Sequence, residues 1–187
     1  MALYKIENDN CLGASHSGPV NIKSEGFVEL SDEEVEKIVN LIRKERTSDI
    51  AKLMLEDVYP DIYDKLCAAY YEMAYNAEEL YWLRTGWNNG YFDYDIRELI
   101  IYCMENCGYD YEFDEGESID DLIDEDGINC NILIDFTHWL DYYIESLDDE
   151  EFKDFLYNHI NVELDLDDIE YEVYIPKAII KLAEKKN

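Results

Sequence analysis

Two cysteines have the spacing of a shared metal site. Cys103 and Cys107 are four residues apart, so a helix over residues 95–107 would bring both thiols to one face. A structural zinc ion needs four ligands, and no second cysteine or histidine pair accompanies these two in the sequence. Both lie on an apolar stripe with Leu99 and Ile100, and cysteine is among the most buried residue types. We therefore expect core packing rather than a zinc site.

A second candidate for metal chemistry is the run Asp124-Glu125-Asp126-Gly127, which is similar to part of an EF-hand calcium loop. Aligning Gly127 with the glycine of such a loop places Leu122 at the first ligand position. Leu133 then falls at the twelfth position, where a bidentate glutamate is required. Because the motif fails at both ends, we expect loose divalent-ion binding by many carboxylates and no specific metal site.

Nucleophilic catalysis would have to use Cys11 and His16, which share a glycine-containing loop with Ser15 and Ser17. The residue types fit a Cys–His pair, but no orienting group or oxyanion hole can be identified. His138 is expected to be a surface or boundary residue of its helix rather than a base. With 46 acidic residues every carboxylate pair is a candidate for acid–base chemistry, so such pairs have no specificity. We expect neither a cofactor nor an enzyme.

The charge of the chain is its most unusual property. Against 46 Asp and Glu stand 15 Lys and Arg, for a net charge of -31 over 187 residues. Solubility alone needs a net charge of only about 2 to 8 in magnitude, and self-repulsion on this scale opposes folding. Hydrophobic residues make up 48% and aromatic residues 14%, which is enough for a core and excludes a disordered acidic tail. We therefore expect the excess negative charge to serve a function other than solubility.

The acidic residues are unevenly distributed. Residues 1–92 hold 17 acids and 9 bases, whereas residues 93–176 hold 28 acids and two bases, a net charge of -26. Residues 177–187 have a net charge of +3. This asymmetry favours a dedicated acidic face. We expect residues 1–92 to form a mildly acidic part and residues 93–187 a strongly acidic helical part that ends in a strand and a basic helix, the two packed as one compact unit.

Periodicity and end signals predict the elements that position these residues. Short strands are expected over residues 3–6, 20–23 and 27–30, with a turn-rich loop between the first two. Ser31 and Glu34 have the spacing of a capping box, and Gly86 is expected to end the longest helix. Predicted helices begin near Ser31, Asp49, Pro60, Asp95, Asn131, Asp148 and Lys177.

A further strand is predicted over residues 169–175, where Ile169, Tyr171, Val173 and Ile175 alternate with polar residues. We expect this strand to join the N-terminal ones. The predicted fold is α+β and mostly α-helical, with a small antiparallel sheet packed on five or six helices.

The acidic residues themselves have a spacing that could mimic nucleic acid. Carboxylates at i and i+4 of a helix lie about 6 Å apart, which is comparable to the phosphate spacing along a DNA strand. Asp141, Glu145 and Asp149 are expected to form one such row. The candidate partner-binding residues are Asp110, Glu112, Asp114, Glu115, Glu117, Asp120, Asp121, Asp124, Glu125, Asp126, Asp141, Glu145, Asp148, Asp149, Glu150, Glu151, Asp154, Asp165, Asp167 and Asp168.

A folded surface of this kind could occupy the basic groove of a nucleic-acid-binding protein, displacing the same counterions as DNA and associating quickly through steering. In charge and size the chain resembles DNA-mimicking anti-restriction and anti-CRISPR inhibitors of phages and mobile elements, and the acidic immunity proteins that block nuclease toxins. The resemblance implies an inhibitor whose partner is a nuclease or another DNA- or RNA-binding protein. It assigns no individual residue.

The charge also limits the other partners. Nucleic acid and anionic membranes would repel the chain, no apolar run is long enough to span a bilayer, and the N-terminus has no signal-peptide pattern. The five cysteines suggest no disulfide framework, so a cytoplasmic protein is expected. An acidic scaffold module that binds calcium weakly and has no nucleic-acid-binding target remains the alternative, and dimerisation through tyrosines is left open.

Overall fold

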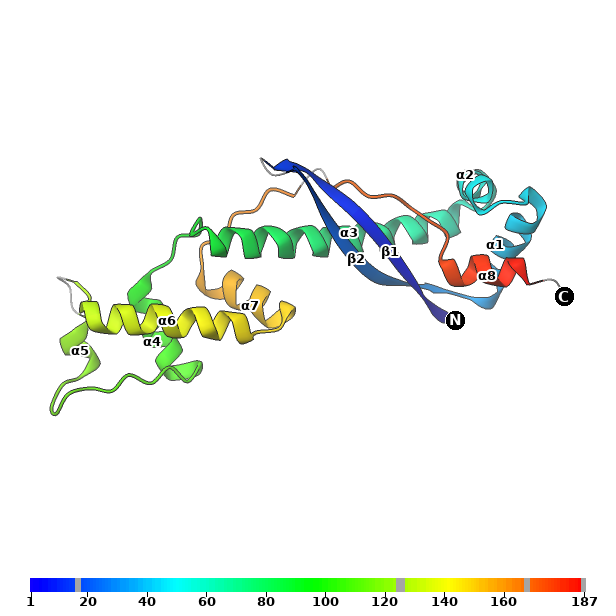
Figure 1. The fold of residues 1–187 in the computed structure, drawn as a ribbon. Coiled ribbons are helices and arrows are strands. Elements are labelled where there is room, and N and C mark those ends of the chain that lie inside the picture. The colour runs from blue at the N-terminus through cyan, green and yellow to red at the C-terminus, as the bar shows by residue number, and fades with distance from the viewer. Residues whose placement is uncertain (16–17, 124–126, 167–168, 186–187) are drawn as a thin grey trace. The chain divides into compact units, whose positions relative to one another are not determined.

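The computed structural model describes residues 1–15, 18–123, 127–166 and 169–185, with only the backbone described for residues 10–15 and 18–20 (Figure 1). Within these ranges the chain is mostly helical and forms one two-stranded antiparallel sheet and eight helices. The predicted α+β, mostly helical class is therefore confirmed.

The chain packs as two compact units. Residues 1–81 and 165–187 form the first unit, and residues 82–164 form the second. The change in charge density divides the sequence at residue 92. Packing instead divides the chain within the long helix α3 (Pro60–Asn88), and the C-terminal residues pack with the first unit. The two units are described separately below.

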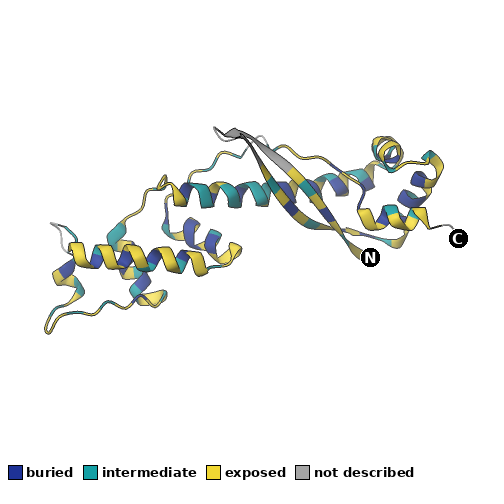
Figure 2. Ribbon diagram, viewed as in Figure 1, coloured by how far each residue is buried: buried dark blue, intermediate teal, exposed yellow. Residues whose placement is uncertain are grey.

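The first unit begins with a long hairpin of β1 (Ala2–Ser15) and β2 (Gly18–Leu30), paired from Ala2↔Leu30 to Ser15↔Gly18. The three short strands expected from the sequence are segments of these two strands. Alternation gives the hairpin two faces, with Ile6 and Val28 buried on one and Phe27 exposed on the other (Figure 2). One face thus supplies the core, as period-2 patterning predicts.

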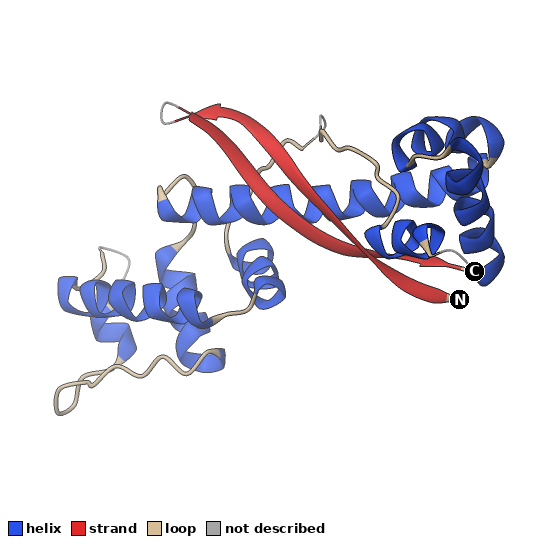
Figure 3. Ribbon diagram, turned by 45° about the vertical axis from the view of Figure 1, so that its right-hand side comes forward, coloured by secondary structure: helices blue, strands red, loops and turns tan. Residues whose placement is uncertain are grey.

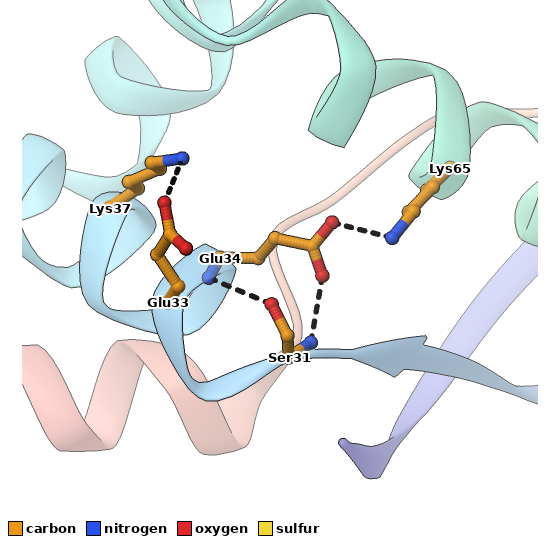
Figure 4. Close-up of polar contacts among 5 residues, drawn as sticks. All are labelled: Ser31, Glu33, Glu34, Lys37 and Lys65. Carbon is orange, nitrogen blue, oxygen red and sulfur yellow. Dashed lines mark hydrogen bonds and ion pairs between the residues drawn. The ribbon is translucent and has the colours of Figure 1, made fainter.

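The capping box predicted at Ser31 is present at the start of α1 (Asp32–Glu45) (Figure 4). Ser31 Oγ accepts a hydrogen bond from the Glu34 amide at 3.2 Å, and the Glu34 carboxylate accepts one from the Ser31 amide at 2.7 Å. The same carboxylate pairs with Lys65 of α3. The Lys65 ammonium and the Ser31 donors lower the pKa of Glu34 to about 2. One acidic side chain therefore both begins α1 and joins it to α3.

Two further helices complete the first unit, α2 (Ser48–Val58) and α8 (Lys177–Glu184). Ile38, Leu66 and Ile179 are fully buried between α1, α3 and α8. The Arg43 guanidinium donates to the carbonyls of Leu182, Ala183 and Lys185 at 3.1–3.3 Å. These are the carbonyls that lack partners at a helix end, so α1 also caps α8.

Residues 169–175 are not a strand, and the prediction that they join the sheet was wrong (Figure 3). The segment is extended but lies against side chains of α3, with Tyr171 edge-on to Tyr71 at 5.8 Å and Tyr174 edge-on to Tyr70 at 6.3 Å. Val173 is buried, as the alternation suggested. The alternation of apolar and polar residues therefore indicated that one side of the segment is buried. Such burial does not require the backbone to pair in a sheet.

The second unit comprises the end of α3 and four helices, α4 (Ile96–Asn106), α5 (Ile119–Leu122), α6 (Cys130–Ser146) and α7 (Asp149–His159). Leu99 and Ile100 of α4, Phe136 of α6, and Phe152 and Leu156 of α7 are buried. Aromatic rings extend this core, since Trp139 stacks on Tyr143 at 4.9 Å and 11°. The helices predicted near Asp95, Asn131 and Asp148 are confirmed.

Gly86 does not end α3, contrary to the prediction. The helix continues to Asn88, and the chain turns at Gly90, which has a φ of 65°. A Cβ built on Gly86 would lie 2.2 Å from Cζ of Phe92. The glycine therefore provides room for an aromatic ring, and the left-handed turn falls four residues later.

Candidate partner-binding surface

The first part of the acidic surface is a loop that follows α4 and is anchored at Tyr109. The Tyr109 side chain is buried, with its ring 5.1 Å from both Phe136 and Trp139. Its hydroxyl donates to Asp135 Oδ2 at 3.0 Å, and burial together with this carboxylate raises the Tyr109 pKa. The loop therefore leaves a fixed point on the aromatic core of the second unit.

The carboxylates on this loop face solvent. Asp110, Glu112, Asp114 and Glu115 are all exposed. A turn at Gly116, with a φ of 87°, brings the Glu117 amide to the Asp114 carbonyl at 2.9 Å. Glu117 also accepts from the Asp114 amide at 3.2 Å. Glu117 therefore stabilises the turn, whereas the four carboxylates before it are presented to solvent.

The loop is fixed again at α5. Leu122 is buried, and the Asp121 carboxylate accepts hydrogen bonds from the Ser118 amide and hydroxyl at 2.8 and 2.7 Å. These bonds lower the pKa of Asp121. Asp120 of the same helix is exposed. The predicted residues Asp124, Glu125 and Asp126, and with them the suggested calcium loop, lie outside the described residues.

The second part of the surface lies on α6 and α7, but the predicted continuous row is wrong. Asp141 and Glu145 are exposed on α6, which ends at Ser146, so Asp149 begins a different helix. Asp149 pairs with Arg84 at 3.1 Å. The i, i+4 spacing of Glu145 and Asp149 spans the boundary between α6 and α7, where Asp148 is the N-cap. The row on α6 therefore contains only Asp141 and Glu145.

Two more of the predicted residues cap α7. The Asp148 carboxylate accepts from the amides of Glu150 and Glu151 at 3.0 and 2.9 Å, and the Glu151 carboxylate accepts from the Asp148 amide at 3.1 Å. Both carboxylates remain exposed but hold the helix start. Glu150 and Asp154 are exposed on the same helix and have no capping bond among those described.

Asp165, another of the predicted residues, belongs to the first unit, with residues 1–81. It is exposed. Asp167 and Asp168 are outside the described residues. The described acids among the predicted residues 110–154 therefore belong to the second unit, whereas Asp165 belongs to the first.

The second unit has little positive charge to offset these acids. By sequence, residues 82–164 contain 23 Asp and Glu against Arg84, Arg97 and Lys153, a net charge of -20. Arg84, which the sequence analysis did not single out, lies 4.1 Å from the Phe152 ring and pairs with Asp149. Nine of the predicted acids in this unit are exposed and have neither an ion pair nor a capping bond among the described contacts: Asp110, Glu112, Asp114, Glu115, Asp120, Asp141, Glu145, Glu150 and Asp154.

The other residues considered for metal binding or catalysis are buried, exposed on a helix, or outside the described side chains. Cys103 is buried in the core, as expected, and burial beside Cys107 raises its pKa to about 12. No cluster of three metal-ligating side chains occurs among the residues whose placement is described. His138 is exposed. The side chains of Cys11, Ser15, His16 and Ser17 are not among those described.

Comparisons with known proteins add no identity. The chain matches no protein-family model, no curated protein and no solved structure. Among the helices of the described ranges, none is both long and apolar enough to cross a membrane.

Proposed function

We propose that this protein is a stoichiometric inhibitor that presents the acidic surface of its second unit to the basic nucleic-acid groove of a nuclease or another DNA- or RNA-binding protein. The supporting observation is the set of nine exposed carboxylates defined above, which have no ion pair or capping bond among the described contacts. They are carried by α5, α6, α7 and a loop anchored at Tyr109 and Leu122.

The physical basis is electrostatic. B-DNA carries about one negative charge per 1.7 Å of its axis, and a protein that neutralises phosphates releases bound counterions. A folded unit with a net charge of -20 attracts the same basic residues. Helices and anchored loops hold its carboxylates before binding, which lowers the ordering cost of association. Binding of this kind should weaken steeply as salt rises.

The test compares two variants with the same change in net charge. The surface variant is Asp110→Asn, Glu112→Gln, Asp141→Asn and Glu145→Gln, which avoids every acid that caps a helix or pairs with Arg84. The control is Glu36→Gln, Asp57→Asn, Asp64→Asn and Glu72→Gln, all exposed positions in the first unit. Circular dichroism and thermal melting check that both fold as the parent does.

The tagged proteins are used to capture partners from the lysate of the native host, and bound proteins are challenged with duplex DNA or RNA at constant salt. We expect the parent and the control to retain nucleic-acid-binding proteins that the added nucleic acid displaces. The surface variant should lose them and, with a purified partner, show a smaller slope of log affinity against log salt. It should also inhibit a purified nuclease partner less.

Two results would contradict the proposal. One is capture that added nucleic acid does not compete, or that both variants reduce equally. The other is a calcium site of stoichiometric occupancy with a dissociation constant below about 10⁻⁵ M in calorimetry, which would favour a calcium-binding scaffold.

A further inference from the structure

A hollow of about 360 Å³ lies in the second unit, apart from the acidic loop and the α6–α7 surface. It is formed by the last turns of α3, the segment after Gly90 and residues 161–164. Its walls include the aromatic side chains of Trp82, Tyr91 and Phe92 and the carboxylates of Asp93 and Glu163.

Backbone bonds build this hollow. The Tyr91 amide donates to the Gly86 carbonyl at 2.9 Å, and the Asn161 amide donates to the Asp93 carbonyl at 2.9 Å, within an antiparallel bridge. Phe92 fits against Gly86, where a Cβ would displace it. These contacts hold the Tyr91–Asp93 backbone against the end of α3 and beside Asn161.

The aromatic rings and the carboxylates that line the hollow are groups that bind cations. The faces of aromatic rings attract Lys, Arg and ligand cations. Trp82 and Tyr91 line the hollow and are 38% and 74% exposed as whole residues. Asp93 and Glu163 are exposed beside them, and none of the described residues that line the hollow is basic. The hollow therefore combines aromatic surface with negative charge, and its described lining includes no basic side chain.

The same chain uses this chemistry to hold an arginine of its own. A second hollow, of about 450 Å³, includes Arg84, Asp141, Glu145 and Phe152 in its lining. There the Arg84 guanidinium lies over the Phe152 ring at 4.1 Å and pairs with Asp149 at 3.1 Å. An aromatic face and a carboxylate thus hold an arginine of the chain itself, whereas the described lining of the first hollow has the same kinds of group and no arginine.

We propose that the hollow of Trp82, Tyr91, Phe92, Asp93 and Glu163 binds an arginine side chain of a protein partner. A guanidinium is planar, stacks on aromatic faces and donates from several N–H groups, whereas an ammonium is a compact, strongly hydrated charge. Two carboxylates beside flat rings match the guanidinium better. The inference rests on the proposed function only for the basic character of the partner.

The test uses no partner protein, so that its failure and the failure of the proposed function are distinguishable. N-acetyl-arginine methylamide is titrated at constant ionic strength, and the indole N–H resonances of Trp82, Trp87 and Trp139 are followed by NMR, with Trp82 assigned by Trp82→Phe. We expect a saturable shift at Trp82 and much smaller shifts at the other two. The neutral citrulline analogue should produce none, and the lysine analogue should bind more weakly.

Charge-matched variants locate the effect. Asp93→Asn with Glu163→Gln should weaken arginine binding by about tenfold or more, as expected for lost charge-assisted hydrogen bonds. Asp110→Asn with Glu112→Gln removes the same charge elsewhere in the unit and should change binding less than about twofold. Tyr91→Ala removes a largely exposed ring without removing a buried contact and should weaken binding several-fold.

The proposal is overturned if the three indoles shift alike, if citrulline shifts Trp82 as arginine does, or if the two double variants lose equal affinity. Binding of the lysine analogue as tight as that of arginine would overturn the assignment to arginine. If arginine binds as expected while no nucleic-acid-binding partner is found, the hollow stands and the proposed function fails.

Discussion

At the scale of single residues, the Glu34 carboxylate links the start of α1 to α3. This carboxylate caps α1 through Ser31 and pairs with Lys65, and these contacts lower its pKa to about 2 from the ordinary 4.5. A carboxyl with a lowered folded-state pKa stabilises the protein above its unfolded-state pKa and loses that contribution as the pH falls through the folded value.

Glu34→Gln should therefore lower the free energy of unfolding at pH 7 by about 1 kcal/mol, as expected for a lost cap. The difference from the parent should be constant above about pH 4.5 and shrink as the pH falls towards 2. Urea unfolding at a series of pH values measures both.

Glu33→Gln is the matched control. Glu33 is the adjacent carboxylate, 77% exposed, and its pair with Lys37 is an ordinary i, i+4 surface contact (Figure 4), worth about 0.3–0.5 kcal/mol. Equal losses for the two variants, or a Glu34→Gln effect that grows as the pH is lowered, would contradict the role of Glu34.

The cysteines should differ sharply in reactivity, because the thiolate is the reacting form. Burial raises the pKa of Cys103 to about 12, whereas Cys130 is exposed at the start of α6. In a Cys11→Ser background, a maleimide pulse near neutral pH should label Cys130 rapidly and Cys103 only in denaturant. Mass spectrometry of the peptides would show this, and equal labelling of both in the folded protein would place Cys103 outside the core.

At the level of the elements, Gly86 lies within α3 and makes room for the ring of Phe92. In an open helix, replacing glycine with alanine stabilises by about 1 kcal/mol. Here a Cβ would meet the Phe92 ring at 2.2 Å. We expect Gly86→Ala to destabilise the second unit by about 1–3 kcal/mol through overpacking, measured by urea unfolding with tryptophan emission.

Phe92→Leu provides the rescue for this prediction. In the double variant Gly86→Ala, Phe92→Leu, the smaller side chain leaves room for the new methyl group. The loss should therefore be smaller than the sum of the two single losses. Additive losses would mean that Gly86 and Phe92 do not meet.

The helix ends also separate structural acids from those available to a partner. Asp121, Asp148, Asp149 and Glu151 hold caps or pair with Arg84. Substituting them would weaken the fold as well as any binding. The exposed acids without such contacts are the positions at which an effect on binding is interpretable.

At the level of the whole chain, the charge opposes folding more in one unit than in the other. The second unit has a net charge of -20 over residues 82–164, and the remaining residues have a net charge of -11. All three tryptophans, Trp82, Trp87 and Trp139, lie in the second unit. Tryptophan emission therefore reports on the more acidic unit alone.

Raising NaCl from low to moderate concentration should raise the melting temperature followed by tryptophan emission, because salt screens self-repulsion. Each kcal/mol gained corresponds to about 2–4 °C for a chain of this size. The surface variant Asp110→Asn, Glu112→Gln, Asp141→Asn, Glu145→Gln should show a smaller gain. A melting temperature that falls over this range, or an equal gain in the variant, would contradict the prediction.

Local signals in the sequence predicted most of the elements. The capping box at Ser31, the cap at Asp148 and the helix starting at Asp95 are confirmed, because such signals depend on neighbours a few residues apart. The predictions that failed depended on distant contacts. Gly86 makes room for the Phe92 ring and does not end its helix. The tyrosines of residues 169–175 pack on α3, and the segment does not pair with the sheet.

The sequence by itself determined the class of the fold, the positions of most helices and the excess of negative charge, since composition and short-range periodicity specify these. Only the tertiary structure decided which acids are committed to caps and ion pairs, that Asp165 belongs to a different unit from Asp110, and that Trp82, Tyr91, Asp93 and Glu163 meet in one hollow. These relations depend on contacts between residues far apart in the chain, which spacing along the sequence does not encode.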